Sequence, residues 1–131
     1  MYYGALEAGG TKMVCAIGDA DKNIIDRISI PTGTPDQSVP AMIDYFKKYD
    51  ISALGIGTFG PADINPNSPT YGSIMRSPKK DWEGFSLYKA FTDVLGCLVV
   101  VDTDVNAAAW GEYLYGALKG LNSGMYLTVG T

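Results

Sequence analysis

Three short stretches of this 131-residue sequence carry residues that could do chemistry on a substrate. One contains Asp102 and Asp104, in the order Asp-Thr-Asp-Val-Asn-Ala-Ala-Ala after an apolar run. A carboxylate at a strand end that faces a cleft can accept the proton of a substrate hydroxyl. An aspartate between a strand and a helix is also a good helix N-cap, so both interpretations stay open at this point.

The sequence contains no histidine, which narrows the chemistry that these carboxylates could serve. Histidine is the commonest general base and the commonest metal ligand, so a base in this chain must be a carboxylate. Cys15 and Cys97 lie far apart inside apolar runs, without the paired spacing of a zinc or redox site. We therefore expect two buried thiols that behave as small hydrophobic residues.

The second stretch, residues 7–12, has the sequence Glu-Ala-Gly-Gly-Thr-Lys and lies between two apolar runs. Two glycines at such a turn let backbone N–H groups approach a phosphate with no side chain in the way. The turn leads into a strand, so it is neither a Walker loop nor the dinucleotide fingerprint. Taken by itself, a plain hairpin turn is the commoner explanation of such a glycine pair.

The third stretch, residues 55–63, reads Gly-Ile-Gly-Thr-Phe-Gly-Pro-Ala-Asp at the end of a short apolar run. Glycines at a strand end predict that another group approaches the backbone closely. A turn dictated by packing alone explains the pattern equally well. The stretch therefore gains meaning only together with the other two.

The apolar periodicity predicts the elements that hold these stretches. Three short strands at residues 2–6, 12–17 and 23–30, separated by tight turns, form an antiparallel meander. An amphipathic helix follows, with Pro40 in its first turn and with apolar residues at Val39, Met42, Ile43 and Phe46. A strand at residues 52–57 leads into a long Pro-, Asn-, Ser- and Gly-rich segment that ends at Trp82, and such long loops are usually functional.

The remainder alternates between helix and strand. We expect a helix at 87–95, a strand at 98–101, a helix at 105–118 and a strand at 125–129. One face of the third helix carries Ala107, Trp110, Leu114 and Leu118. The fold class is thus α/β with a mixed sheet, and such sheets bind ligands at the carboxyl ends of their strands. The residues expected at those ends are Glu7, Phe59 and Asp102.

Composition restricts the class of protein. A hydrophobic fraction of 47% with 18% charged residues is typical of one globular domain. The chain has no run of about 18 apolar residues and no signal-peptide pattern at its start, so we expect a cytoplasmic protein with no membrane partner. A formal net charge of −4 argues against a nucleic-acid partner, because phosphate backbones require clustered Lys and Arg.

The order of the three stretches resembles the amino-terminal lobe of the ROK family of sugar kinases and regulators, over essentially the whole chain. Residues 71–74 (Tyr-Gly-Ser-Ile) and 77–82 (Ser-Pro-Lys-Lys-Asp-Trp) resemble the bacterial fructokinases of that family, as does Glu7, where most members carry Asp. The resemblance implies an actin-like ATPase fold of the ribonuclease H-like type. It also implies that residues 1–131 form one lobe and that a carboxyl-terminal lobe lies beyond them.

Site residues follow from the resemblance. It implies that the first phosphate turn consists of Gly9, Gly10, Thr11 and Lys12, and that Glu7 faces Mg²⁺ through water. It implies that Asp104 takes the proton of the sugar hydroxyl, and that Gly60, Pro61 and Thr103 lie with Asp104 in the sugar pocket. Thr103 stands where glucokinases carry Asn, which argues against a glucokinase. Asn106 is expected to fix the helix start rather than to contact substrate.

The implied activity is ATP- and Mg²⁺-dependent phosphorylation of a hexose, with fructose preferred. Alternatives are a ROK kinase for glucose or an N-acetylhexosamine, and a sugar-sensing regulator without catalysis. Regulators carry a helix-turn-helix ahead of the kinase-like region, whereas the first strand here begins at Tyr2, which favours a kinase. The resemblance also implies that the chain ends, at residues 130–131, inside a second glycine-rich phosphate turn, and that the family's zinc site belongs to the other lobe. We expect a homodimer, and no kinase activity from residues 1–131 alone.

Overall fold

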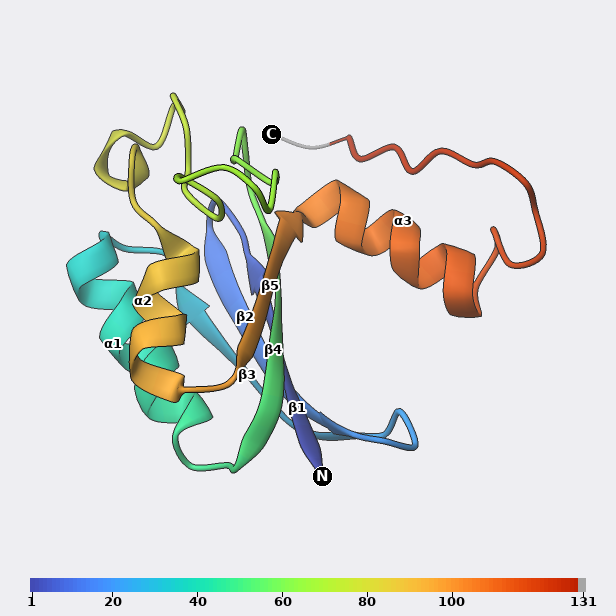
Figure 1. Cartoon of the computed structure of the whole chain (residues 1–131), viewed down its shortest axis with the longest axis horizontal. Helices are drawn as coiled ribbons and strands as arrows, with labels where there is room; N and C mark the ends of the chain where they lie inside the picture. The colour runs from blue at the N-terminus through green and yellow to red at the C-terminus, as the bar shows by residue number, and fades with distance from the viewer. Residues whose placement is uncertain (130–131) are drawn as a thin grey trace.

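A sheet of five strands forms the centre of the molecule in the computed structural model, which describes residues 1–129 (Figure 1). Its strand order is β3-β2-β1-β4-β5. The first three strands are antiparallel neighbours, whereas β4 and β5 run parallel to β1, so the predicted meander and mixed sheet are confirmed. The strands are β1 (Tyr2–Ala8), β2 (Lys12–Asp19), β3 (Ile24–Pro31), β4 (Ile51–Thr58) and β5 (Leu98–Thr103).

The parallel strands end together at one edge of the sheet. Glu7 in β1 pairs with Gly57 in β4, and Gly57 pairs with Asp102 in β5. Successive strands lie about 4.8 Å apart, so the first and the last residue of this row are about 10 Å apart. The residues that follow each strand therefore lie close together in space.

The helices cover both faces of the sheet. Helices α1 (Pro35–Phe46) and α2 (Leu87–Leu95) lie on one face, and α3 (Asp104–Tyr115) lies on the other (Figure 1). Alternating strand residues pack under α1 and α2, as the period of two in a strand requires. This core includes Leu6, Met13, Cys15, Ile17, Val39, Met42, Phe46, Leu54, Ile56, Leu87, Phe91, Val99 and Val101.

Helix α1 begins earlier than its apolar pattern indicates. Thr34 is its N-cap, the backbone N–H of Thr34 donates to Oε1 of Gln37 at 3.1 Å, and Pro35 occupies the first position. Pro40 therefore lies inside the helix, and the prediction that it lies in the first turn is wrong. Proline has no N–H, so the carbonyl one turn earlier in α1 loses its helical donor. The side chain of Pro40 is exposed, so this carbonyl lies on the solvent side of the helix.

The end of the chain differs most from the prediction. Helix α3 ends at Tyr115 rather than at residue 118, with Gly116 as its C-cap, and contains no buried residue. Trp110, predicted to lie on a packed face, is 62% exposed. Residues 125–129 form no strand, because a strand needs a hydrogen-bonded neighbour and none of residues 1–129 pairs with them. The second phosphate turn expected at residues 130–131 lies outside the described residues.

Only one of the two thiols is fully buried. Cys15 lies in the core, where burial raises the pKa of its thiol to about 12. Cys97 is half-buried, so the prediction of two buried thiols is only half right. Within residues 1–129, no helix is long and apolar enough to cross a bilayer.

Candidate active site

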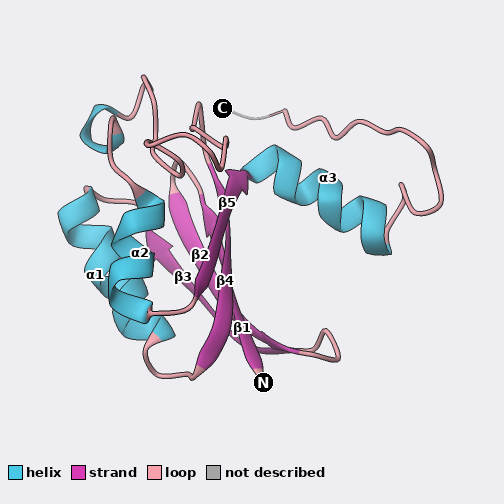
Figure 2. Ribbon diagram, in the orientation of Figure 1, coloured by secondary structure: helices cyan, strands magenta, loops and turns pink. Residues whose placement is uncertain are grey.

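All three stretches meet at the carboxyl edge of the parallel strands. The glycine turn follows β1, Gly60 and Pro61 follow β4, and α3 begins directly after β5. Figure 2 shows the long segment after β4, most of it loop, above this same edge of the sheet. Local sequence signals thus place a candidate phosphate turn, a close-approach loop and a carboxylate side by side.

In the glycine turn, backbone N–H groups are left free while backbone carbonyl groups are hydrogen-bonded. Thr32 in the neighbouring loop ties down two carbonyl oxygens: its N–H donates to Thr11 O at 3.0 Å and its hydroxyl donates to Gly9 O at 2.9 Å. The N–H of Gly9 closes the turn onto Lys12 O at 3.0 Å. Within residues 1–129, the N–H groups of Gly10 and Thr11 donate to no acceptor. Free N–H groups beside occupied carbonyls are a feature of anion sites, so residues 9–12 are a candidate phosphate turn.

Gly57 lets the start of α3 lie against β4. A Cβ placed on Gly57 would lie 3.0 Å from Cβ of Ala107 and 3.4 Å from Cα of Asp104. A Cβ placed on Gly55, by contrast, would have no neighbour within 4 Å. The close approach predicted for this stretch is therefore made by the first turn of α3 onto Gly57.

This contact leads to a prediction for the stability of the chain. We expect Gly57→Ala to lower the free energy of unfolding by about 1–3 kcal/mol, because its methyl group would crowd the first turn of α3. Gly55→Ala is the matched control and should change the free energy of unfolding by less than about 0.5 kcal/mol. Urea unfolding of both variants, followed by circular dichroism, measures the difference. Equal free energies of unfolding in the two variants would show that α3 does not pack tightly against Gly57.

Thr103, not an aspartate, caps α3. Its hydroxyl oxygen accepts from the N–H of Asn106 at 3.2 Å, which corrects the interpretation of Asp104 as the N-cap. Asp102 accepts from the Asn106 side-chain amide at 2.8 Å and from the N–H of Thr103 at 2.7 Å. The placement of Asn106 at the helix start is as predicted. Both Asp102 and Asn106 are thus engaged in holding the local backbone.

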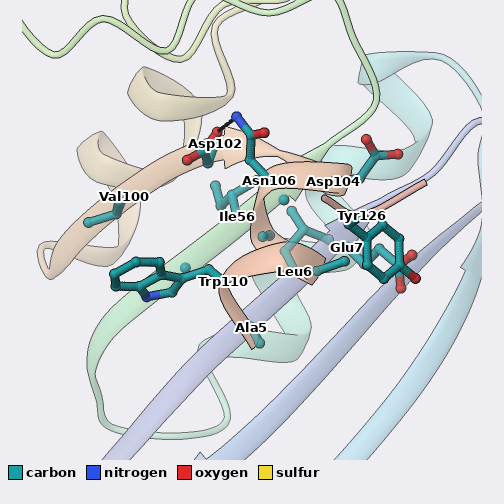
Figure 3. Close-up of a pocket in the computed structure, with 14 residues that line it drawn as sticks. Ala5, Leu6, Glu7, Ile56, Val100, Asp102, Asp104, Asn106, Trp110 and Tyr126 are labelled. Atoms are coloured by element: carbon teal, nitrogen blue, oxygen red, sulfur yellow. Dashed lines mark hydrogen bonds between the residues drawn. The ribbon is translucent and has the colours of Figure 1, made fainter. Parts of the chain in front are cut away.

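Asp104 is the second carboxylate at the start of α3. It is half-buried in the first position of α3, and one of its oxygens accepts from the N–H of Val105 at 2.9 Å. Its carboxylate turns away from the pair formed by Asp102 and Asn106 (Figure 3). A negative charge at the amino end of a helix interacts favourably with the helix dipole.

A pocket of about 800 Å³ lies between the sheet and α3. Glu7 and Asp104 line it, whereas residues 9–12, Gly60, Pro61 and Thr103 do not. Most of its wall is the apolar sheet face, including Ala5, Ile56 and Val100, together with Trp110 from α3 (Figure 3). The pocket therefore contains the carboxylates Glu7, Asp102 and Asp104, and the glycine turn lies outside it.

The loop after β4 is held from two sides. The Gly60-Pro61 peptide bond is cis, and Pro61 O accepts from the N–H of Met75 at 2.8 Å. Phe59 packs edge-on against Trp82, with ring centroids 6.1 Å apart. The buried Trp82 ring in turn donates from Nε1 to Gly33 O at 2.9 Å. This indole thus links the loop after β4 to the loop that holds the glycine turn.

Two residues hold the long segment in place through hydrogen bonds that the sequence did not predict. The hydroxyl of Tyr71 accepts from Val101 N at 2.7 Å and donates to Val101 O at 3.1 Å, which ties the long segment to the outer edge of β5. Asp63 accepts from the hydroxyls of Ser68 and Thr70, and these bonds lower the pKa of its carboxyl. The spacing of Asp, Ser and Thr is a local signal for the second of these contacts, whereas no local signal exists for the first.

Metal ligands are sparse in the described part of the chain. Among residues 1–129, no group of three or more His, Cys, Asp or Glu side chains could hold a metal ion. Glu7 is exposed at the carboxyl edge, and Gly57 is its partner in the neighbouring strand. A single carboxylate fits Mg²⁺, which keeps several waters and takes its other ligands from substrate phosphates.

Comparison with known proteins identifies the family of this chain. The ROK family matches residues 3–131. A relative from Bacillus subtilis (strain 168) is 47% identical over 128 residues, which cover 98% of this chain and 43% of the relative. The fructokinase of Pediococcus pentosaceus is 44% identical over 131 residues, covering 100% of this chain and 46% of the relative. The chain thus spans less than half the length of these relatives.

A solved structure agrees with this placement. The ROK family glucokinase from Streptomyces griseus, in complex with glucose and AMPPNP, superimposes with a TM-score of 0.76 at 30% identity. The match covers 92% of this chain and 38% of that one. The actin-like ATPase fold expected from the motifs is therefore confirmed. The chain belongs to the ROK family, as the order of its three stretches predicted.

Proposed function

We propose that this chain supplies the phosphate turn and the general base of an enzyme that transfers the γ-phosphoryl group of ATP to a hexose, preferably fructose. The observation that carries the proposal is that the glycine turn and Asp104 lie at the same edge of the sheet. The free N–H groups of Gly10 and Thr11 lie at one end of the edge and Asp104 lies at the other. The carboxyl ends of β1 and β5 are about 10 Å apart, which leaves room for a hydroxyl and a phosphoryl group in line.

Each residue then has a stated task. The turn of Gly9, Gly10, Thr11 and Lys12 holds the nucleotide phosphates, while Gly60, Pro61 and Thr103 orient the sugar. Asp104 accepts the proton of the sugar hydroxyl while the hydroxyl oxygen attacks the γ-phosphorus and ADP leaves. Positioning supplies most of the rate, because phosphoryl transfer needs little covalent help from the protein.

Glu7 is proposed to hold the water shell of Mg²⁺. The ion neutralises charge on the phosphates when it is bound. Glu7 reaches one methylene further than an aspartate would, which suits contact through water. The residues of this chain form no cage of their own within residues 1–129, so the phosphates provide the remaining ligands. The zinc expected from the resemblance belongs to the other lobe.

Fructose is the proposed sugar for two reasons. The chain is 44% identical to a relative named fructokinase and 30% identical to a solved glucokinase. The hydroxyl oxygen of Thr103 also accepts the capping hydrogen bond of α3. Its O–H group is therefore the short donor that Thr103 can offer to the sugar. A sugar-sensing regulator without catalysis is the alternative, but the unpaired N–H groups of the turn favour a protein that binds phosphate.

A hexose panel tests the proposal. The full-length enzyme is assayed for ADP release with Mg-ATP and with fructose, glucose, mannose or N-acetylglucosamine. We expect fructose to give the highest kcat/KM, and a higher value for another hexose would overturn the substrate assignment only. Residues 1–131 form the control arm and should release no ADP, because the second lobe is needed to close over the phosphates. Turnover by that arm would refute the division of the site between two lobes.

The predicted homodimer stays a prediction. The apolar side chains that α3 and the sheet edge leave exposed include Leu98, Val100, Trp110, Tyr113 and Tyr115. In a monomeric protein, exposed apolar clusters of this kind mark contact surfaces.

A further inference from the structure

A lysine with no assigned task lies against the phosphate turn. A Cβ placed on Gly10 would lie 3.4 Å from Cε of Lys79, so the aliphatic stem of this lysine crosses the glycine. The ammonium group is one bond beyond that carbon. It therefore lies within reach of an anion held by the N–H groups of Gly10 and Thr11.

The backbone around this lysine is fixed relative to the turn. The N–H of Lys79 donates to the buried Ser77 hydroxyl at 3.2 Å, and its carbonyl accepts from Trp82 N at 3.0 Å. Trp82 is 1% exposed and is bonded to Gly33, the neighbour of the Thr32 that ties down the turn. One buried indole thus anchors the lysine segment to the loop that shapes the anion site.

The charge of Lys79 is not neutralised by a carboxylate in the described chain. Within residues 1–129, the one ion pair joins Lys80 to Glu83 at 3.1 Å. The two adjacent lysines therefore differ: one pairs on the surface of the short helix η1 (Lys80–Trp82), and the other lies over the glycine turn. An unpaired ammonium beside free backbone N–H groups strengthens an anion site.

We propose that Lys79 is a second cationic contact for the nucleotide phosphates, acting beside the turn of residues 9–12. This inference rests on the proposed function, because it assigns a further residue to the same site. The partner is a phosphate rather than a sugar hydroxyl, since an ammonium ion is a compact point charge that suits a dianionic group. The position of Lys79 opposite Gly10, and not beside Asp104, agrees with that partner.

A matched pair of variants in the full-length enzyme tests the inference. Lys79→Met keeps the stem that contacts Gly10 and removes the charge, while Lys80→Met removes the neighbouring charge. Calorimetric titration with Mg-AMPPNP measures nucleotide affinity without turnover. We expect Lys79→Met to bind about tenfold more weakly and to raise the KM for ATP similarly, with the KM for the sugar unchanged. Lys80→Met should match wild type within twofold.

Several outcomes separate this inference from the proposed function. Equal nucleotide affinity in the two variants would overturn the role of Lys79, as would an effect confined to the KM for the sugar. Wild-type enzyme that binds Mg-AMPPNP but phosphorylates no hexose would overturn the proposed function, and the titration would still decide the role of Lys79. Wild-type enzyme that does not bind the nucleotide would overturn both.

Discussion

Replacing Asp104 by Asn in the full-length enzyme should lower kcat about 10²-fold or more while the KM for the sugar changes little. An amide has nearly the shape of the carboxylate and still accepts the bond from Val105 N, so the start of α3 should remain in place. What it loses is the ability to accept the proton of the sugar hydroxyl. Steady-state kinetics of ADP release measures the change.

Asp102→Asn is the control for this prediction. Asp102 lies two residues away and carries the same charge, but its Oδ1 accepts from both the Asn106 side chain and the N–H of Thr103. An Asn oxygen at position 102 keeps both acceptor bonds, so kcat should stay within a few-fold of wild type. If Asp104→Asn also stays within a few-fold, Asp104 acts only through its position in the helix start and is not the base.

Trp82→Ala should lower the free energy of unfolding of this chain by about 3–5 kcal/mol, as expected for truncating a buried tryptophan. The indole is 1% exposed and packs edge-on against Phe59 and Phe85. Its Nε1–H is the donor to Gly33 O, so the substitution also leaves a carbonyl without its partner. Urea unfolding followed by circular dichroism measures the loss.

Trp82→Phe separates the two parts of this effect. A phenyl ring keeps most of the packing but has no N–H donor, so we expect a loss of about 1–2 kcal/mol. A loss below about 1 kcal/mol for Trp82→Ala would contradict the view that this side chain binds the loops of the site together.

Much of the sheet could be predicted because its signals are local. Alternating apolar residues around two tight turns define β1, β2 and β3, and the residues of α2, Leu87–Leu95, match the predicted helix. The glycine pair and the strand-end position of Asp102 need only a few neighbouring residues to be recognised. These features predict, from the sequence alone, that the glycine turn and Asp102 lie at one edge of the sheet.

The contacts that shape the site join residues far apart in the sequence. Tyr71 bonds to Val101, and Trp82 bonds to Gly33, across separations of 30 and 49 residues. The contact of Lys79 with Gly10 is of the same kind. No periodicity reports such a pairing, because it depends on how the long loop folds back over the sheet.

The wrong predictions have the same physical origin. The apolar run of residues 125–129 has the composition of a strand, but strand formation depends on a neighbouring edge that a local pattern does not contain. Trp110 and Leu114 have helical spacing, yet α3 has no buried residue and Trp110 is 62% exposed. Apolar spacing predicts an element more reliably than it predicts what the element packs against.

The most direct test of the account is a crystal structure of the full-length protein with fructose and Mg-AMPPNP. We predict that a carboxylate oxygen of Asp104 lies about 2.6–3.2 Å from one sugar hydroxyl, the reach of a general base. The terminal phosphate should accept from the N–H groups of Gly10 and Thr11. A sugar bound away from Asp104, or phosphates bound away from the glycine turn, would contradict the central claim that this sheet edge is the site of phosphoryl transfer.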